Sequence, residues 1–413
     1  MDKPLNIFLD NRHVARLWLD NKYYCFQYVT DDIPPISLTL PVRKEPYLRD
    51  EAKPYFANLL PEGATRNTIE TKMGLTRGDD FELLKRIGGD CAGAITVFPE
   101  GEFPEANHQY TALSSNELER LIKDLPQNPL YTGYSKSVRL SLAGAQHKVA
   151  LLIDGGVYSL PENGAPSSHI LKVPISNLPG IADTVENEVF SMMFAREVGL
   201  DVPDVDLVTI GGIPVFVTRR YDREIDSSGR LRRLLQEDFC QLMVLEPTVK
   251  YQHAGGPSLE DCANKIREHS VDGITDIEQL VRWSLFNVII GNADAHGKNI
   301  SVLLGNGGVR LAPFYDIMST RVYGQAHDKE LAMSIGRKYN PDDLTRENWK
   351  QMAEFMDISY KLVRRVFEDI SGMVDRGLAK TVSDFHSVYG PAEIVDRIAE
   401  DIDRQNKILR GII

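Results

Sequence analysis

Residues 292–299 read NADAHGKN, and this stretch decides how the rest of the chain is interpreted. The carboxylate of Asp294 precedes the amide of Asn299 by five residues. An expected strand, a glycine-rich turn over 305–308 and a second strand then lead to Asp316. Mg²⁺ prefers hard oxygen ligands, which Asn299 and Asp316 supply, and Asp294 adds a carboxylate that can accept a hydrogen bond from a hydroxyl. The sequence therefore predicts one acid that orients a hydroxyl and an amide–acid pair that holds magnesium.

This order of groups is typical of the active centre of a protein kinase. There an Asp orients the attacking hydroxyl, an Asn holds one Mg²⁺, and an Asp beyond a hairpin holds another. The pattern predicts phosphoryl transfer from ATP, in which positioning and cations over the phosphates matter more than covalent chemistry. We expect Asp294 to be the base and Asn299 and Asp316 to bind Mg²⁺. Lys298 would steady the γ-phosphate, and His296 would position the loop at the nucleotide.

A block of strands with one helix precedes this stretch and follows the order of a kinase N-lobe. Alternating apolar residues predict the strands, and an apolar stripe of helical period predicts the helix. The third strand carries Lys172, which we expect to bind the α- and β-phosphates and to pair with an acid on the helix. Glu188 is the candidate for this pair, and Glu186 is the alternative. The expected elements are strands at 149–153, 157–160, 169–173, 206–210 and 214–219, and a helix at 183–198 that Asp183 can cap.

The length of 413 residues exceeds one ordinary core and predicts more than one domain. We expect an α+β chain in three parts. A small N-terminal α/β domain spans 1–130, a β-rich kinase-like N-lobe with the nucleotide loop spans 131–240, and a helix-dominated C-lobe with the catalytic loop and metal site spans 241–413. Further expected elements are strands at 5–9, 14–19, 23–29, 300–304 and 309–312, helices at 54–60, 79–87, 114–124 and 280–290, and helical periodicity after 339.

Charge and cysteine usage limit the class of protein. The net charge of −12 indicates that the chain as a whole is not built to coat nucleic acid. The four cysteines, Cys25, Cys91, Cys240 and Cys262, lack C-x-x-C spacing, which argues against a disulfide framework or zinc site and fits a reducing cytosol. No signal peptide is visible, and the apolar runs are too short to span a bilayer. We therefore expect a cytoplasmic protein without a membrane partner.

Two other functions remain open from the residues. Asp294 and His296 could begin a metal-hydrolase site, although the other histidines are scattered and form no second ligand motif. A non-catalytic nucleotide-binding co-repressor is the second alternative. The complete set of Asp294, Asn299, Asp316 and Lys172 argues against it, because a binding module needs no base. The glycine-rich stretch 88–93 lacks a following Walker Lys-Ser/Thr and is interpreted as a structural turn.

Collinear motifs along nearly the whole chain resemble the HipA family, the kinase toxins of bacterial type II toxin–antitoxin pairs. Two groups of motifs carry the resemblance, one near the N-terminus and one in the expected kinase core. So many motifs in the same order make a chance match improbable. They lie at 45–47, 54–63, 88–94, 141–148, 169–172, 236–241, 292–299 and 313–316.

The resemblance implies a role for each matching position. Asp294 matches the catalytic base, Lys172 the phosphate-binding lysine, and Asn299 and Asp316 the Mg²⁺ ligands. Ser141 matches a serine that family kinases autophosphorylate, which expels the nucleotide loop and switches the enzyme off, since a dianion there would repel ATP. The loop over the nucleotide corresponds to Ala143, Gly144, Ala145, Gln146, His147 and Lys148, and the hinge whose backbone holds adenine corresponds to Glu237 and Phe239.

The resemblance also implies cofactors and partners. ATP and Mg²⁺ would be the cofactors of a serine/threonine protein kinase that arrests growth as a toxin. A small HipB-like DNA-binding antitoxin would hold it in check, and together they would repress their own operon, with operator DNA contacted mainly through the antitoxin. The negative net charge fits that division of labour. A family target is glutamyl-tRNA synthetase, phosphorylated on a serine near its ATP site.

Overall fold

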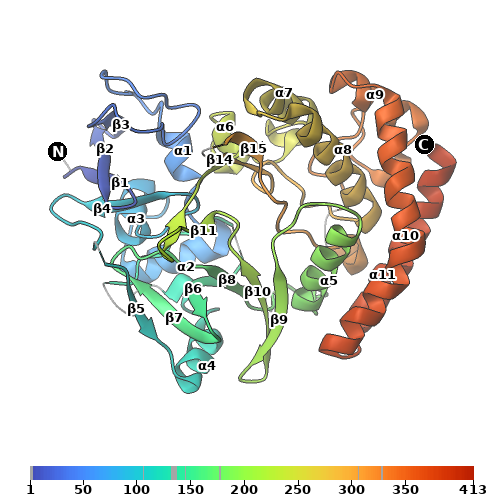
Figure 1. Cartoon of the computed structure of the whole chain (residues 1–413), viewed down its shortest axis with the longest axis horizontal. Coiled ribbons are helices and arrows are strands. Elements are labelled where there is room, and N and C mark those ends of the chain that lie inside the picture. Colours follow the sequence, from blue (N-terminus) through green and yellow to red (C-terminus); the bar gives the residue numbers. More distant parts are fainter. Residues whose placement is uncertain are drawn as a thin grey trace. The chain divides into compact units, whose positions relative to one another are not determined.

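The computed structural model describes residues 3–105, 107–131, 137–144, 146–175, 178–305, 307–326 and 329–413. The chain forms two compact units. Unit 1 comprises Met1–Val173 and Val208–Pro247, and unit 2 comprises Pro174–Leu207 and Thr248–Ile413. Unit 1 contains both strands and helices, whereas helices dominate unit 2, so the expected α+β class is confirmed (Figure 1). The predicted division into three domains stays a prediction.

A four-stranded antiparallel sheet begins unit 1, with strand order β3-β2-β1-β4. Apolar residues at alternate positions bury one face, and Leu5, Ile7 and Leu17 are fully buried. The three strands expected near the N-terminus are therefore confirmed, whereas β4 was not predicted. The elements are β1 (Leu5–Leu9), β2 (Arg12–Asp20), β3 (Tyr23–Tyr28) and β4 (Ile95–Pro99).

The described residues before 129 form four α-helices beside the sheets, and three of them were expected. Asp79 caps α3 by accepting the backbone N–H of Glu82 on its side chain. The helix α2 was missed because it lacks an apolar stripe: its buried residues are Thr65, Ile69 and Glu70. The helices are α1 (Lys53–Ala57), α2 (Gly63–Met73), α3 (Asp80–Ile87) and α4 (Ser115–Asp124).

The second sheet carries the expected lysine strand and has the order β5-β7-β6-β8-β10-β9. In its centre Lys172 of β8 lies opposite Lys148 of β6 on one side and Phe216 of β10 on the other. The five predicted strands are confirmed, and β5 was not foreseen. The strands are β5 (Gln109–Ala112), β6 (Lys148–Asp154), β7 (Val157–Glu162), β8 (His169–Lys172), β9 (Val205–Ile210) and β10 (Ile213–Arg219).

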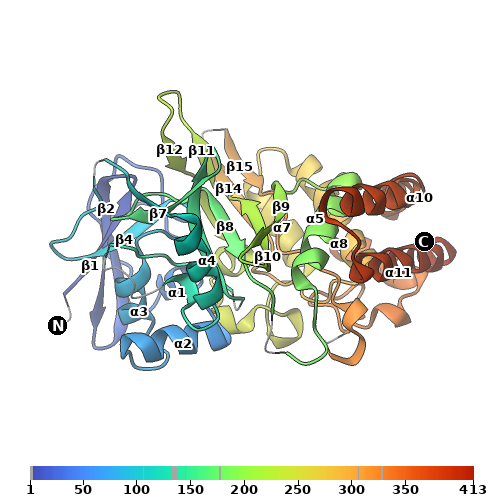
Figure 2. The same cartoon turned by 90° about the horizontal axis from the view of Figure 1, so that it is seen from below.

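Unit 2 is built around α8, which is apolar on nearly all sides and mostly buried. The helices α10 and α11 run side by side and both contact α5 and α8 (Figure 2). The expected capping of α5 by Asp183 is wrong: Asp183 has left-handed backbone (φ 52°), and its side chain accepts no cap hydrogen bond. The helices are α5 (Thr184–Glu197), α7 (Leu259–His269), α8 (Gly273–Ile290), α9 (Arg346–Phe355), α10 (Tyr360–Tyr389) and α11 (Glu393–Ile412).

The expected hairpin after the catalytic stretch is present in unit 2. It consists of β14 (Ser301–Gly305) and β15 (Gly308–Leu311), which pair antiparallel. It places residue 316 a few positions beyond its second strand, as the kinase-like order requires. Within the described ranges, the structure has no helix that is both long and apolar enough to cross a membrane.

Candidate active site

The candidate catalytic loop, residues 292–299, begins where α8 ends. Gly291 has left-handed backbone (φ 73°), and a Cβ there would lie 2.6 Å from Cβ of Arg321, so glycine is required at this close approach. The guanidinium of Arg321 donates to the carbonyl oxygens of Val288 (3.1 Å) and Ile289 (2.9 Å). These bonds satisfy carbonyls that the helix end leaves without partners. The exit of the chain into the loop is therefore fixed.

Hydrogen bonds within the loop hold the candidate base in place. The carbonyl oxygen of Asp294 accepts from Nδ2 of Asn299 (2.8 Å) and from the backbone N–H of His296 (2.9 Å). Asn292 is buried and accepts the backbone N–H of Asp294 on Oδ1 (3.0 Å). Because Nδ2 of Asn299 is committed to the loop, Oδ1 is the atom of that amide that can hold a cation.

The second acid is tied to the same loop by a tyrosine. The hydroxyl of Tyr315 donates to the carbonyl oxygen of Lys298 (2.7 Å) and shares a hydrogen bond with Ser301 of β14 (2.7 Å). Asp316 follows directly and has φ 59°, a left-handed conformation that few residues other than glycine adopt. The side chains of Lys298 and Asn299 are each 6% exposed. The hydrogen bond from Tyr315 thus places the residue before Asp316 against the loop that carries Asp294 and Asn299, and the shared metal site stays a prediction.

The structure gives no support to the metal-hydrolase alternative. Among the residues that the structure describes, no group of three or more His, Cys, Asp or Glu side chains lies where it could hold a metal ion. The donor set of Asn299 and Asp316 instead fits a hard cation that also takes oxygen ligands from a phosphate.

In unit 1, the segment before β6 is held against the N-terminal domain. Ser141 is fully buried, and its Oγ donates to the carbonyl oxygen of Leu59 (2.7 Å). The carbonyl oxygen of Gly144 accepts the backbone N–H of Glu62 (3.1 Å). A phosphate on Ser141 has no room in this arrangement. Ala145 lies outside the described residues.

The described residues of the expected nucleotide loop contact the end of β8. Gly144 has φ 100°, and a Cβ there would come within 2.8 Å of Nζ of Lys148, which hydrogen-bonds the carbonyl oxygen of Ala143. Gln146 donates through Nε2 to the carbonyl oxygen of Val173 (3.2 Å). The carbonyl oxygen of His147 accepts the backbone N–H of Val173 (3.3 Å). Burial lowers the pKa of His147. The loop therefore meets the chain one residue after Lys172.

Lys172 itself is 7% exposed in the middle of its sheet. Its ammonium lies 5.1 Å from the ring centroid of Phe216, a cation–π distance. Glu188 is 1% exposed on α5, and burial raises the pKa of Glu186 on the same helix. Because Lys172 belongs to unit 1 and both acids belong to unit 2, the choice of ion-pair partner stays a prediction.

Family models match most of the chain. The HipA N-terminal domain matches residues 5–98, and the HipA-like C-terminal domain matches residues 140–378, more than half of the sequence. The chain belongs to the HipA family. The C-terminal match contains Lys172 and the candidate catalytic loop, and the N-terminal match contains the sheet β1–β4 up to its last residue, Pro99.

Relatives of this HipA-family chain are named as kinases. The "Putative kinase Y4mE" of Sinorhizobium fredii is 36% identical over 99% of both chains. The "Serine/threonine-protein kinase toxin HipA" of Shewanella oneidensis is 29% identical over 78% of this chain and 74% of that protein. A solved Shewanella oneidensis structure of HipA, HipB and operator DNA matches 99% of this chain and 98% of that one, with TM-score 0.84 and 24% identity. The HipA kinase-like fold is therefore shown.

The expected hinge of this HipA-family chain is anchored by a buried carboxylate. Glu237, in β13 (Leu235–Asp238), accepts Oγ–H of Ser37 (2.8 Å) and the backbone N–H of Leu38 (2.6 Å). Burial raises its pKa to about 7, against the lowering effect of these hydrogen bonds. Phe239 is fully buried at the start of α6 (Phe239–Leu242). The side chains are thus structural, and the adenine-binding role of the backbone stays a prediction.

Glu237→Gln is expected to change how stability depends on pH. The pKa of Glu237 is about 7 in the folded chain and near 4.5 unfolded, so its contribution is greatest below pH 4.5 and is lost as pH rises through 7. Gln stays neutral at every pH. When pH rises from 5 to 8, the free energy of unfolding of wild type should therefore fall by about 2 kcal/mol relative to that of the variant. Urea unfolding at both pH values measures this, with the exposed Glu224→Gln as control. An equal pH response in wild type and Glu237→Gln would contradict the assignment.

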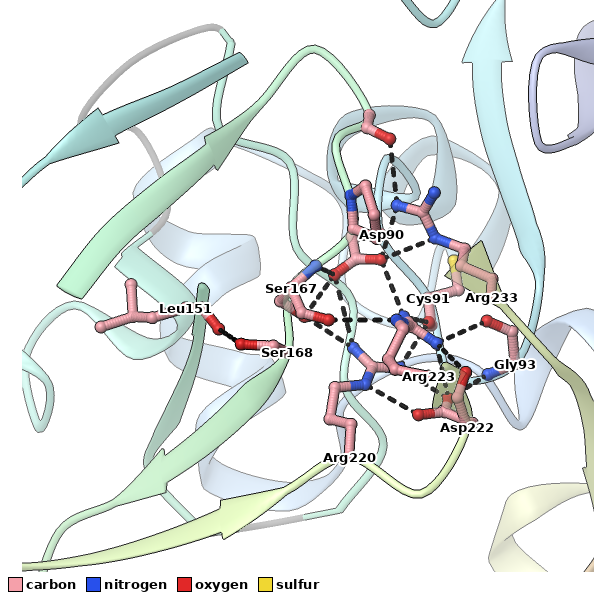
Figure 3. Close-up of polar contacts among 12 residues, drawn as sticks. Asp90, Cys91, Gly93, Leu151, Ser167, Ser168, Arg220, Asp222, Arg223 and Arg233 are labelled. Atoms are coloured by element: carbon pink, nitrogen blue, oxygen red, sulfur yellow. Dashed lines mark hydrogen bonds and ion pairs between the residues drawn. The ribbon is translucent and has the colours of Figure 1, made fainter. Parts of the chain in front are cut away.

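A buried cluster that the sequence reasoning missed holds the glycine-rich turn (Figure 3). The carboxylate of Asp90 accepts hydrogen bonds from Arg220 (3.4 Å), Arg223 (2.9 Å) and Arg233 (2.7 Å). It also accepts Oγ–H of Ser167 (2.6 Å). The three arginines come from 130 to 143 residues further along the chain, so no local pattern could reveal the contact.

The cluster reaches the nucleotide loop through the backbone. The carbonyl oxygen of Asp90 accepts the backbone N–H of Ser141 (3.0 Å), and Asp90 forms a parallel bridge with Leu140. Asp222 completes the charge pattern, because it pairs with Arg220 (2.8 Å) and accepts the backbone N–H of Gly93 (2.7 Å). The turn at 88–93 is structural, as expected, and it anchors the segment that carries Ser141.

Proposed function

We propose that this chain is an ATP- and Mg²⁺-dependent serine/threonine protein kinase that acts as the toxin of a HipBA-type pair. The main observation behind this proposal is a hydrogen bond in the loop, from Nδ2 of Asn299 to the carbonyl oxygen of Asp294. This bond leaves Oδ1 of Asn299 available as a metal ligand. The half-exposed side chain of Asp294 is then available to a substrate hydroxyl, and Asp316 lies beyond the hairpin as the second oxygen donor. This support adds to the kinase names of the relatives.

The proposed reaction assigns one task to each group. Asp294 accepts the hydrogen bond, and finally the proton, of a substrate serine hydroxyl. The hydroxyl oxygen forms a bond to the γ-phosphorus, and the bond from that phosphorus to the β,γ-bridging oxygen breaks to release ADP. Lys298 steadies the γ-phosphate and Lys172 the α- and β-phosphates. Mg²⁺ held by Asn299 and Asp316 would supply positive charge against the phosphate oxygens.

We further propose partners for this activity. The matched Shewanella oneidensis structure contains HipA, HipB and operator DNA, which supports a HipB-like antitoxin for this chain. The net charge of −12 favours operator contact through such a partner, with the pair repressing its own operon. Glutamyl-tRNA synthetase is the proposed substrate, by likeness to the family alone.

Autophosphorylation should map to Ser141. The buried hydroxyl of Ser141 is held by Leu59, so a phosphate can be added only after the loop has left its place, and a dianion then prevents its return. After incubation with Mg²⁺ and ATP, mass spectrometry of proteolytic peptides should find one phosphate at residue 141.

The matched variants make this result decisive. Ser141→Ala should lose that phosphate, whereas Ser159→Ala, which alters a buried serine on β7, should keep it. Phosphate incorporation that persists in full in Ser141→Ala would place self-modification elsewhere and contradict the proposed switch.

A further inference from the structure

A tyrosine from outside the catalytic loop contacts the candidate base. The hydroxyl of Tyr251 donates to Oδ1 of Asp294 over 2.5 Å. Nε2 of His296 lies 3.8 Å from the same oxygen. The side chain of Asp294 is 41% exposed, and its Oδ2 accepts no hydrogen bond from the part of the chain that the structure describes. One carboxylate oxygen is therefore held by the protein, and the other remains available for a nucleophile.

Tyr251 is the centre of a three-residue strap, Lys250 to Gln252, that joins two parts of unit 2. The carbonyl oxygen of Lys250 accepts the backbone N–H of Gly297 in the catalytic loop (3.1 Å). Gln252 donates its backbone N–H to the carbonyl oxygen of Ala332 (3.0 Å) and accepts the backbone N–H of Ser334 on Oε1 (2.7 Å). Both ends of the strap are thus fixed by backbone hydrogen bonds.

The chain turns back sharply directly after the strap. The carbonyl oxygen of Tyr251 accepts the backbone N–H groups of Ala254 (3.0 Å) and Gly256 (2.9 Å). Gly255 has φ 98°, and a Cβ at Gly256 would lie only 2.4 Å from the carbonyl oxygen of Val249. Two successive glycines are therefore required for this turn. Its backbone geometry sets where the Tyr251 side chain begins.

Aromatic contacts then fix the direction of the Tyr251 ring. His253 stacks on it with centroids 5.6 Å apart and planes at 26°. His296 of the catalytic loop meets it edge-on, with centroids 5.1 Å apart and planes at 89°. The hydroxyl is consequently held against Asp294 by the fold, before any substrate binds.

We propose that Tyr251 is a positioning residue for phosphoryl transfer, an inference that rests on the proposed kinase function. The carboxylate of an Asp rotates over a broad range about its last torsion. The hydrogen bond from Tyr251 fixes Oδ1 and so aims Oδ2 at the hydroxyl to be phosphorylated. Correct alignment of the reacting groups before attack is a major source of rate enhancement in this class of reaction.

Tyr251→Phe tests the proposal, because it removes the hydroxyl and keeps the ring. The readout is incorporation of labelled phosphate from ATP and Mg²⁺ into the full-length protein, measured as initial rate against ATP concentration. The maximal rate should fall about tenfold, because a carboxylate free to rotate is aligned with the hydroxyl for less of the time. The half-saturating ATP concentration and the melting temperature should stay unchanged.

Tyr339→Phe is the matched control. Tyr339 meets His253 edge-on with centroids 6.2 Å apart, so it belongs to the same aromatic group. Within the described residues its hydroxyl makes no hydrogen bond to Asp294. This variant should incorporate phosphate at the wild-type rate.

The possible outcomes distinguish the positioning role of Tyr251 from the proposed kinase function on which it rests. An active wild type with a Tyr251→Phe variant of equal rate overturns the positioning role and leaves the kinase intact. A variant that loses rate together with ATP saturation or melting temperature also overturns it, because a general structural role then explains the loss. A wild-type protein that transfers no phosphate overturns the proposed function, and this inference with it.

Discussion

Asp294→Asn should lower the rate of phosphate transfer by about a thousandfold while the protein remains folded. Loss of a positioned general base typically costs a factor of 10² to 10⁴. The amide matches the carboxylate in shape, and the backbone oxygen that binds Asn299 and His296 is untouched. The loop should therefore persist while its ability to take the hydroxyl proton is lost.

The measurement is the initial rate of labelled phosphate incorporation at saturating ATP and Mg²⁺. Asp403→Asn on α11 provides the control, since Asp403 is an exposed acid paired only with the neighbouring Lys407 among the described residues. Expression in a bacterial host should show the same division: wild type and Asp403→Asn arrest growth, and Asp294→Asn does not. Full transfer by Asp294→Asn would remove this residue from the chemistry.

Asp90→Asn should destabilise unit 1 by about 4 kcal/mol. Removing one partner of a buried ion pair typically costs about 3–5 kcal/mol, because the opposite charge is left uncompensated. Here the loss leaves three buried guanidinium groups, those of Arg220, Arg223 and Arg233, with only Asp222 to balance them. The amide would also present an N–H group where Asp90 now only accepts.

Urea unfolding at neutral pH measures this effect, with Asp154→Asn at the exposed end of β6 as a control expected within about 0.5 kcal/mol of wild type. Burial would raise the pKa of Asp90, but Arg233, Arg223 and Arg220 outweigh it and lower the pKa well below 3.8. The stabilisation is therefore present above pH 3.8 and is lost only in more acidic solution. A change below 1 kcal/mol at pH 7 would contradict the role of the cluster.

The local motifs were predictable because each is contained in a few neighbouring residues. The strand with Lys172, the loop with Asp294 and Asn299, and the hairpin before Asp316 all follow from residue type and periodicity. The family match then confirmed the kinase-like fold in which they lie.

What the sequence did not reveal depends on long-range contacts or on unusual backbone. Asp90 contacts Arg223 and Arg233, which lie 133 and 143 residues further along the chain. Tyr251 contacts Asp294, which lies 43 residues further along. The helix α2 carries too few apolar residues to show a stripe, and Asp183 adopts a left-handed conformation that its sequence neighbours did not indicate. Such features follow from tertiary packing, which overrides local propensity.

Transfer of the γ-phosphate of ATP is the central claim, and one comparison tests it most directly. Purified wild type and Asp294→Asn are incubated with γ-labelled ATP and Mg²⁺, and protein-bound phosphoserine is quantified over time. We predict steady incorporation by wild type and almost none by the variant. Wild-type protein that binds ATP yet transfers phosphate neither to itself nor to any protein of a bacterial extract would contradict it.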